Sequence, residues 1–182
     1  NGATVADNDA PSAAQGTDFG FVGRGQAVTN TLTLTNSGLV ALSIPSWIAT
    51  GPNAGDFTLL NAPTSVDAGG SAALQIVFSS VSGGFSTNRV TFSNDSTNGA
   101  FRLNLSGSAP HLVTPVCGAN GTLTPASAMS VLPGGSTSIV VRADAYYHIG
   151  QLLTNNAADA KATSTTAYTS RWENVRADGS VQ

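Results

Sequence analysis

Residues 17–38 read TDFGFVGRGQAVTNTLTLTNSG, and this stretch decides the fold. Between Val28 and Thr35, positions 28, 32 and 34 are apolar and every odd position is threonine. An alternation with a period of two predicts an antiparallel strand that is buried on one face and wet on the other. The next three residues, at 36–38, are Asn, Ser and Gly, which tolerate the positive φ angles of a turn.

Short apolar segments separated by turn residues continue on both sides of this strand as far as residue 109. We expect strands at 19–22, 39–44, 56–60, 72–78, 90–92 and 101–105, with Trp47 leading into a loop at 50–55. About seven short strands with frequent turns predict an all-β fold, a β-sandwich. The inward positions share one parity on each strand, which predicts a single core of Phe19, Leu32, Leu34, Leu74, Ile76, Phe78, Val90, Phe92, Leu103 and Leu105.

The composition limits the kinds of partner. Only 9% of the 182 residues are charged, against roughly 25% in an average soluble domain. Such a polar but almost uncharged surface is typical of secreted β proteins. A net charge of −3 with seven cations argues against nucleic acid, and no apolar run is long enough to insert in a membrane. Because the chain has neither a starting Met nor a signal peptide, we expect it to be a processed or excised piece of a longer protein.

Cys117 is the only cysteine, so it has no partner for an internal disulfide and offers no cysteine-based metal site. We expect it to be a small buried apolar residue. The alternative is a cross-link to another chain.

Five motifs in order carry a family resemblance over about residues 1–109. They are TDFG at 17–20, TLTNSG at 33–38, GPNAGDF at 51–57, AGGS at 68–71 and LSGSA at 105–109. The order resembles the choice-of-anchor D domain, a bacterial relative of the hydin-type, immunoglobulin-like group, and implies an immunoglobulin-like β-sandwich. Two features depart from that family: it has a further strand before the Asn-Gly that here is Asn1-Gly2, and an acidic or proline-containing loop where residues 79–84 read SSVSGG.

Pro110 and His111 mark a boundary, after which we expect strands at 112–117, 129–131, 136–143 and 146–153. Residues 155–166 are expected to form a loop, in which 157–162 would allow one helical turn. The pieces NGTLTP (120–125), PGGS (133–136), YHI (147–149), WENV (172–175) and ADG (177–179) resemble internalin-type B repeats. This resemblance implies a second, small β-rich domain over residues 110–182.

No group of residues stands out as catalytic, and we expect no enzyme activity, no cofactor and no metal. There is no GxSxG motif, and the repeat resemblance assigns His148 to packing beside Tyr147. Asp7, Asn8 and Asp9 would offer oxygens to calcium, but a calcium loop uses more ligands and a bidentate Glu. The alternative for this stretch is an Asx turn.

Two functions remain open. The resembled modules occur as spacers and stalks, which implies a non-catalytic structural or adhesive module of an extracellular, secreted bacterial surface protein. The alternative is a carbohydrate-binding module of a secreted enzyme, in which sugars stack on aromatic side chains. Its candidates are Trp47, Tyr146, Tyr147 and Trp172, although aromatic residues of this kind are more often buried.

Both resemblances indicate a missing edge strand at an end of the chain, and an unpaired edge recruits a strand from elsewhere. We therefore expect partners to be other copies of the chain or neighbouring domains of its parent protein, with surface glycans as the alternative. Copies exchanging strands would form a head-to-tail fibre. Its contacts would fall at Asn1, Gly2, Cys117, Val181 and Gln182.

Overall fold

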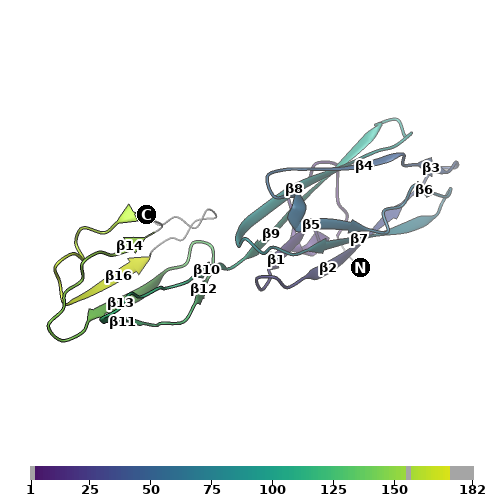
Figure 1. The fold of residues 1–182 in the computed structure, drawn as a ribbon. Coiled ribbons are helices and arrows are strands. Elements are labelled where there is room, and N and C mark those ends of the chain that lie inside the picture. The colour runs from purple at the N-terminus through teal and green to yellow at the C-terminus, as the bar shows by residue number, and fades with distance from the viewer. Residues whose placement is uncertain (1–2, 155–156, 173–182) are drawn as a thin grey trace. The chain divides into compact units, whose positions relative to one another are not determined.

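The computed structural model describes residues 3–154 and 157–172, with side chains up to residue 170. The described residues form strands and two short 3-10 turns, η1 (Ala13–Gln15) and η2 (Ala54–Asp56), which confirms the all-β prediction. The chain divides into two compact units, Asn1–Ala109 and Pro110–Gln182, both drawn in Figure 1. No helix in the described part of the chain is long and apolar enough to cross a membrane.

Two main sheets make up the first unit. One has the order β1-β9-β8-β4 and consists of β1 (Asp18–Phe21), β9 (Ala100–Ala109), β8 (Gly84–Ser93) and β4 (Ser46–Thr50). The other has the order β2-β7-β5 and consists of β2 (Val28–Thr35), β7 (Ser71–Phe78) and β5 (Phe57–Leu60). The short strands β3 (Leu42–Ser43) and β6 (Ser65–Val66) pair with each other. Only β1 and β9 pair in parallel; the other described pairs in this unit are antiparallel.

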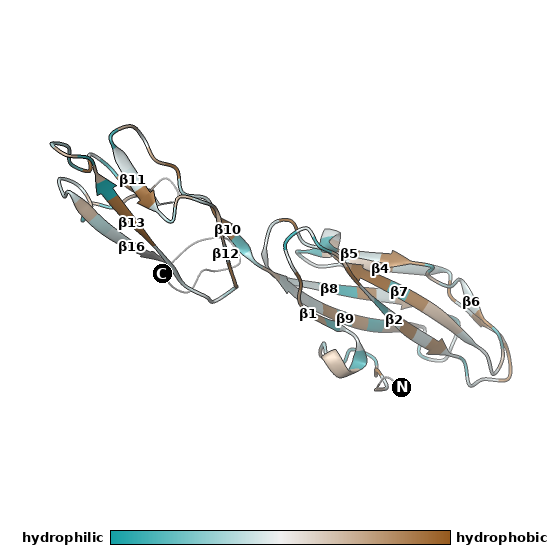
Figure 2. Cartoon of the chain, turned by 90° about the horizontal axis from the view of Figure 1, so that it is seen from below, coloured by the Kyte–Doolittle hydropathy of each residue, from teal (hydrophilic) through white to brown (hydrophobic). Residues whose placement is uncertain are grey.

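The main core fills the space between these sheets. In Figure 2, apolar positions run along β2 and β7. Seven of the ten predicted core residues are buried in one cluster, and Leu32 and Leu34 pack against it. Phe92 is the exception: it is buried in a second cluster with Ile44 and Val66. The prediction of a single core was wrong there. The parity of a position along a strand shows which face of the sheet its side chain lies on, but not which residues of other strands pack against it.

The strand expected at 39–44 was wrong in its first half. Only β3 is extended there, while the side chains of Leu39 and Val40 are 96% and 77% exposed. The Asn36 side-chain amide donates to the carbonyl oxygens of Val40, Val66 and Asp67 at 2.8, 3.0 and 3.2 Å. These bonds hold the chain in a turn where its apolar sequence favours a strand. Trp47 lies in strand β4, which ends at Thr50 and leads into the loop that follows.

The second unit contains a three-stranded antiparallel sheet and two small ladders. The sheet has the order β11-β13-β16 and consists of β11 (Gly121–Thr124), β13 (Thr137–Ala143) and β16 (Ala167–Trp172). The ladders join β10 (His111–Val113) to β12 (Met129–Val131) and β14 (Leu153–Thr154) to β15 (Ala157–Ala158). Two small clusters of buried residues lie in this unit, around Val131 and around Ile149.

Three expectations for the second unit are corrected. The strand predicted at 112–117 ends at Val113, and Val116 is 86% exposed. Residues 146–152 are not a strand, because the chain turns at Tyr146, where φ is +72°. The helical turn considered for 157–162 does not begin at Ala157, which lies in strand β15.

Candidate functional site

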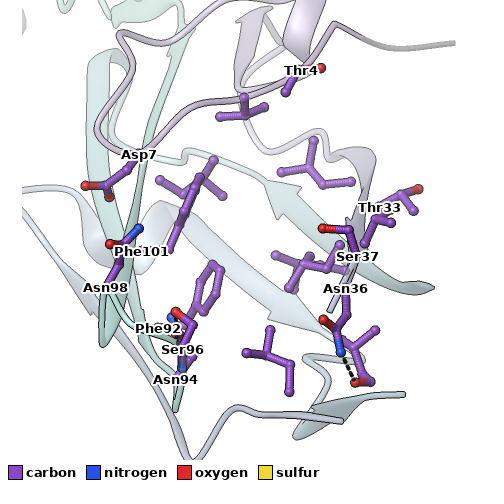
Figure 3. A pocket seen from close by; sticks show the side chains of 18 of the residues that line it. Thr4, Asp7, Thr33, Asn36, Ser37, Phe92, Asn94, Ser96, Asn98 and Phe101 are labelled. Atoms are coloured by element: carbon purple, nitrogen blue, oxygen red, sulfur yellow. Dashed lines mark hydrogen bonds between the residues drawn. The ribbon is translucent and has the colours of Figure 1, made fainter. Parts of the chain in front are cut away.

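A groove of about 680 Å³ opens on one side of the first unit, and it is the site that the fold presents. It runs between β2 on one side and the first half of β9, with the N-terminal segment, on the other. Figure 3 shows Thr33, Asn36 and Ser37 across the opening from Asp7, Asn94 and Asn98. Its lining comes from segments far apart in the sequence, because the two sheets bring them together.

The floor of the groove is the apolar interior of the sandwich. Leu34 and Leu74 reach it from the β2-β7-β5 sheet, and Phe92 and Phe101 reach it from the β8–β9 pair. The rings of Phe92 and Phe101 stack with their centroids 5.2 Å apart. The accessible part of this floor comes from partly buried side chains that pack against the two clusters, such as Leu34 and Phe101. Their apolar character favours an apolar occupant.

One wall of the groove is the free edge of β2. All eight residues of β2 pair with β7, and β7 is the only neighbour of β2 in the described part of the chain. The Asn36 N–H donates to Gly70 O at 3.0 Å, which continues the register of this ladder. Because alternate residues of an antiparallel strand face the partner, the backbone N–H and C=O of Thr29, Thr31, Thr33 and Thr35 point away from β7.

The opposite wall is closed by the N-terminal segment. The Asn8 N–H donates to Arg102 O at 2.9 Å, beside the edge of β9. The Asp7 carboxylate accepts the Arg102 backbone N–H at 2.6 Å and the guanidinium Nη1–H at 3.0 Å. Val5 packs against the main core. The segment thus satisfies the edge of β9 and leaves that of β2 open.

The groove is nearly neutral. Among the described lining residues Asp7 alone is charged, and Arg102 neutralises it in a half-exposed ion pair. Nearby, the Ala6 backbone N–H, and secondly the Gln15 side-chain amide, donate to Asp9 Oδ2 and hold the pKa of Asp9 below its ordinary value of 3.8. Asp7 therefore accepts hydrogen bonds from Arg102 of β9, and Asp9 accepts them within the N-terminal segment.

Three kinds of chemical group line the groove. Hydroxyl groups, side-chain amides and apolar side chains make up nearly all of its lining, and the described lining contains no His, Cys or Lys. No cluster of three or more metal-binding side chains occurs among residues 3–154 and 157–170. His148 is exposed in the second unit.

The structure separates the four aromatic residues considered for sugar stacking. Trp47 is half-buried in the first unit: its indole N–H donates to Pro63 O at 2.9 Å, and its ring lies 4.5 Å from that of Phe92. Tyr146 and Tyr147 belong to the second unit, where Tyr146 is fully exposed and Tyr147 is 51% exposed. The backbone of Trp172 ends β16, and its side chain lies outside the described part.

Of the residues expected at intermolecular contacts, only Cys117 is described. It is an exposed free thiol, so the expectation that it is buried was wrong; Val113 ends the strand before the chain reaches it. Asn1, Gly2, Val181 and Gln182 lie outside the described residues.

The groove was not predicted from the sequence. One signal was present: VTNTLTLT contains no charge and no proline, and these are the devices that usually protect an edge strand. The rim residues Asn94 and Asn98 carried no such signal, because the long β8–β9 pair alone brings their loop to the groove.

Comparisons with known proteins bear on the first unit. A family model described as "HYDIN/CFA65/VesB-like, Ig-like domain" matches residues 13–108. No curated protein matches the chain.

Several solved structures are similar to the chain. The secreted serine protease VesC from Vibrio cholerae is 16% identical with a TM-score of 0.42, over 86% of this chain and 42% of VesC. The MSP-domain-like protein SSP-19 of Caenorhabditis elegans is 17% identical with a TM-score of 0.35, over 48% of this chain and 90% of SSP-19. The CupB2 chaperone of Pseudomonas aeruginosa is 14% identical with a TM-score of 0.38, over 88% of this chain and 98% of CupB2. The chain spans less than half of the length of VesC.

Proposed function

Because the chain belongs, through residues 13–108, to the HYDIN/CFA65/VesB-like family of Ig-like domains, we propose that it is a non-catalytic structural or adhesive module of a secreted bacterial surface protein. The family match confirms the hydin-type, immunoglobulin-like part of the resemblance. One observation carries the proposal: the groove joins an apolar floor to an unprotected strand edge and has an uncharged rim. That combination suits the docking of another polypeptide.

An extracellular location fits the low charge of the chain. Only 9% of the residues are charged, and lysine occurs once. The second unit would serve as a spacer, as its resemblance to internalin-type B repeats implies. The three-stranded sheet β11-β13-β16 supports that role, since it is a compact β unit with its own small clusters of buried residues.

The finer form of this function is a fibre in which copies exchange strands at their ends. The low net charge of −3 supports it, because copies with few charges repel one another weakly. The exposed thiol of Cys117 would be able to lock a contact between copies. Light scattering over a range of concentrations tests this form: growth in mass is expected, and a constant monomer contradicts it.

Carbohydrate binding is the second candidate, and one observation favours it. Tyr146 is fully exposed and holds a backbone φ of +72°, which is uncommon for an aromatic residue. A glycan array on the chain tests this candidate, with Tyr146→Ala as the variant that should lose any signal. A Trp47→Ala variant is no equivalent test, since the Trp47 ring packs inside the sandwich.

A further inference from the structure

We propose that the groove is the receptor for an extended strand of a different polypeptide, which adds to the free edge of β2. The strand would be uncharged and would carry an aliphatic side chain at every second position. This inference rests on the proposed binding function but does not require the chain to form a fibre. It identifies the place of docking, the geometry and the chemistry of the partner.

The edge of β2 provides the backbone half of the site. Four threonines, at 29, 31, 33 and 35, present their N–H and C=O groups away from β7, as the ladder register requires. The strand is regular over its eight paired residues, so an incoming strand finds an even row of donors and acceptors. Added strands gain affinity from such main-chain bonds.

The groove provides the side-chain half. On β2 the threonines are exposed and the alternate residues Leu32 and Leu34 turn towards the core. A strand added at this edge continues the same pleat, so every second side chain points into the groove. There it would meet Leu32, Leu34 and Phe101, which line the groove and are only partly buried. Aliphatic side chains are expected at these inward positions because the floor is apolar.

Charge restricts the partner further. Asp7 is the one charged residue in the described part of the lining, and its carboxylate already binds Arg102. The rim is completed by amides and hydroxyl groups such as those of Asn94, Asn98 and Ser37. A charged side chain entering this groove would lose water without gaining an opposite charge. The side chains of the partner that enter the groove or meet its rim are therefore uncharged.

A second copy of this chain is a poor occupant. The longest alternating stretches of the described residues, β2, β7, β8 and β9, are already paired within their own sheets. Donating one of them would dismantle the sandwich of the donor. A separate strand carries no such cost, which is why we assign the groove to a different polypeptide.

The test is fluorescence anisotropy with a labelled nine-residue peptide of alternating isoleucine and threonine, blocked at both ends. Saturable binding is expected. A peptide of the same composition with the alternation broken should bind at least about tenfold more weakly. A peptide N-methylated at the backbone nitrogens along the edge that pairs with β2 should be weakened as much. Equal binding of all three peptides, or no binding of the alternating one, would overturn the proposal.

Two proline variants localise the contact. Thr33→Pro removes one outward N–H from β2 without touching the β7 ladder, and proline is tolerated at such edge positions. Ala49→Pro is its matched control, because residue 49 lies on the free edge of β4 and also points its N–H away from its partner β8. Thr33→Pro should weaken peptide binding at least about tenfold and Ala49→Pro less than about twofold. An unchanged affinity of Thr33→Pro would overturn the assignment.

A third variant guards against misfolding of the proline variants. Ala100→Phe fills the groove from the β9 side without altering β2, and it should also weaken binding. Light scattering without peptide completes the experiment. A dimer that Thr33→Pro abolishes would make a second copy the occupant and overturn the source proposed here, while supporting assembly between copies. A monomer that binds the peptide supports the inference even where the fibre fails.

Discussion

Gly107 illustrates how closely the two sheets approach. A Cβ atom at this position would lie 2.7 Å from Cε1 of Phe78, a ring that is fully buried and contacts the rings of Phe19 and Phe57. Because three packed rings leave little room to move, Gly107→Ala should destabilise the first unit by about 1–3 kcal/mol. Gly55→Ala is the control, since its Cβ meets nothing within 4 Å. Equal urea midpoints for the two variants would contradict the close packing.

Asp9 makes the N-terminal segment sensitive to acid. The Ala6 N–H and the Gln15 amide, which donate to its carboxylate, hold the pKa of Asp9 below 3.8. A lowered pKa in the folded state means that the contribution of Asp9 to stability is present above that ordinary value. It is lost as pH falls from 3.8 through the folded pKa.

We expect the protection factor of the Ala6 amide against hydrogen exchange to fall as the pH drops below 3.8. The protection factor is the ratio of the intrinsic exchange rate to the measured rate at the same pH. Asp9→Asn should remove this dependence, because an amide does not titrate in this range. The same acid response in wild type and Asp9→Asn would place its cause elsewhere.

Strand β2 has one face towards the core and one towards solvent, and a pair of substitutions tests which residues lie on each face. Leu34 packs against both buried clusters of the first unit, while Thr33 is exposed. Leu34→Ala should cost about 2–3 kcal/mol, at the low end for a buried leucine, because the side chain also borders the open groove. Thr33→Ala should cost under about 1 kcal/mol. Chemical denaturation of both variants measures the difference, and equal costs would mean that the faces are reversed.

The sequence predicted β2 and β7 well because their period of two extends over eight residues and each strand supports the other in register. It failed where a few apolar residues had no such support. Leu39 and Val40 are exposed in a turn whose neighbour Asn36 is bonded through its side chain to the distant carbonyl oxygens of Val66 and Asp67. Val116 lies in an irregular segment after β10, and Tyr146 lies in a turn, without a comparable sequence signal for either. Local pattern predicts strands, while tertiary hydrogen bonds decide where short ones stop.

The groove could not be predicted from the sequence for a related reason. Its residues come from the N-terminal segment, β2, β7 and the β8–β9 pair, and only the stacking of two sheets brings them together. Composition did predict its electrostatics. With 9% charged residues, a neutral rim is expected on most faces of the molecule. What composition does not specify is that one neutral face also carries an unpaired strand edge.

Assembly between copies is the prediction that concerns the full chain. Few charges and a net charge of −3 leave little repulsion between copies, and Cys117 is exposed on each. If copies pair through strand edges, the mass measured by light scattering should rise above 18.2 kDa with concentration. The rise should be nearly independent of salt, because uncharged contacts are not screened.

Cys117→Ser separates strand pairing from oxidation. Association through strand edges should persist in this variant and in the presence of a thiol reductant, because backbone hydrogen bonds do not need the sulfur atom. A wild-type dimer that reductant or Cys117→Ser converts to a monomer would show that a disulfide alone joins the chains. A mass that stays at one chain under all these conditions would rule out the fibre. The Ig-like module would then work as a single copy, through whatever strand its groove receives.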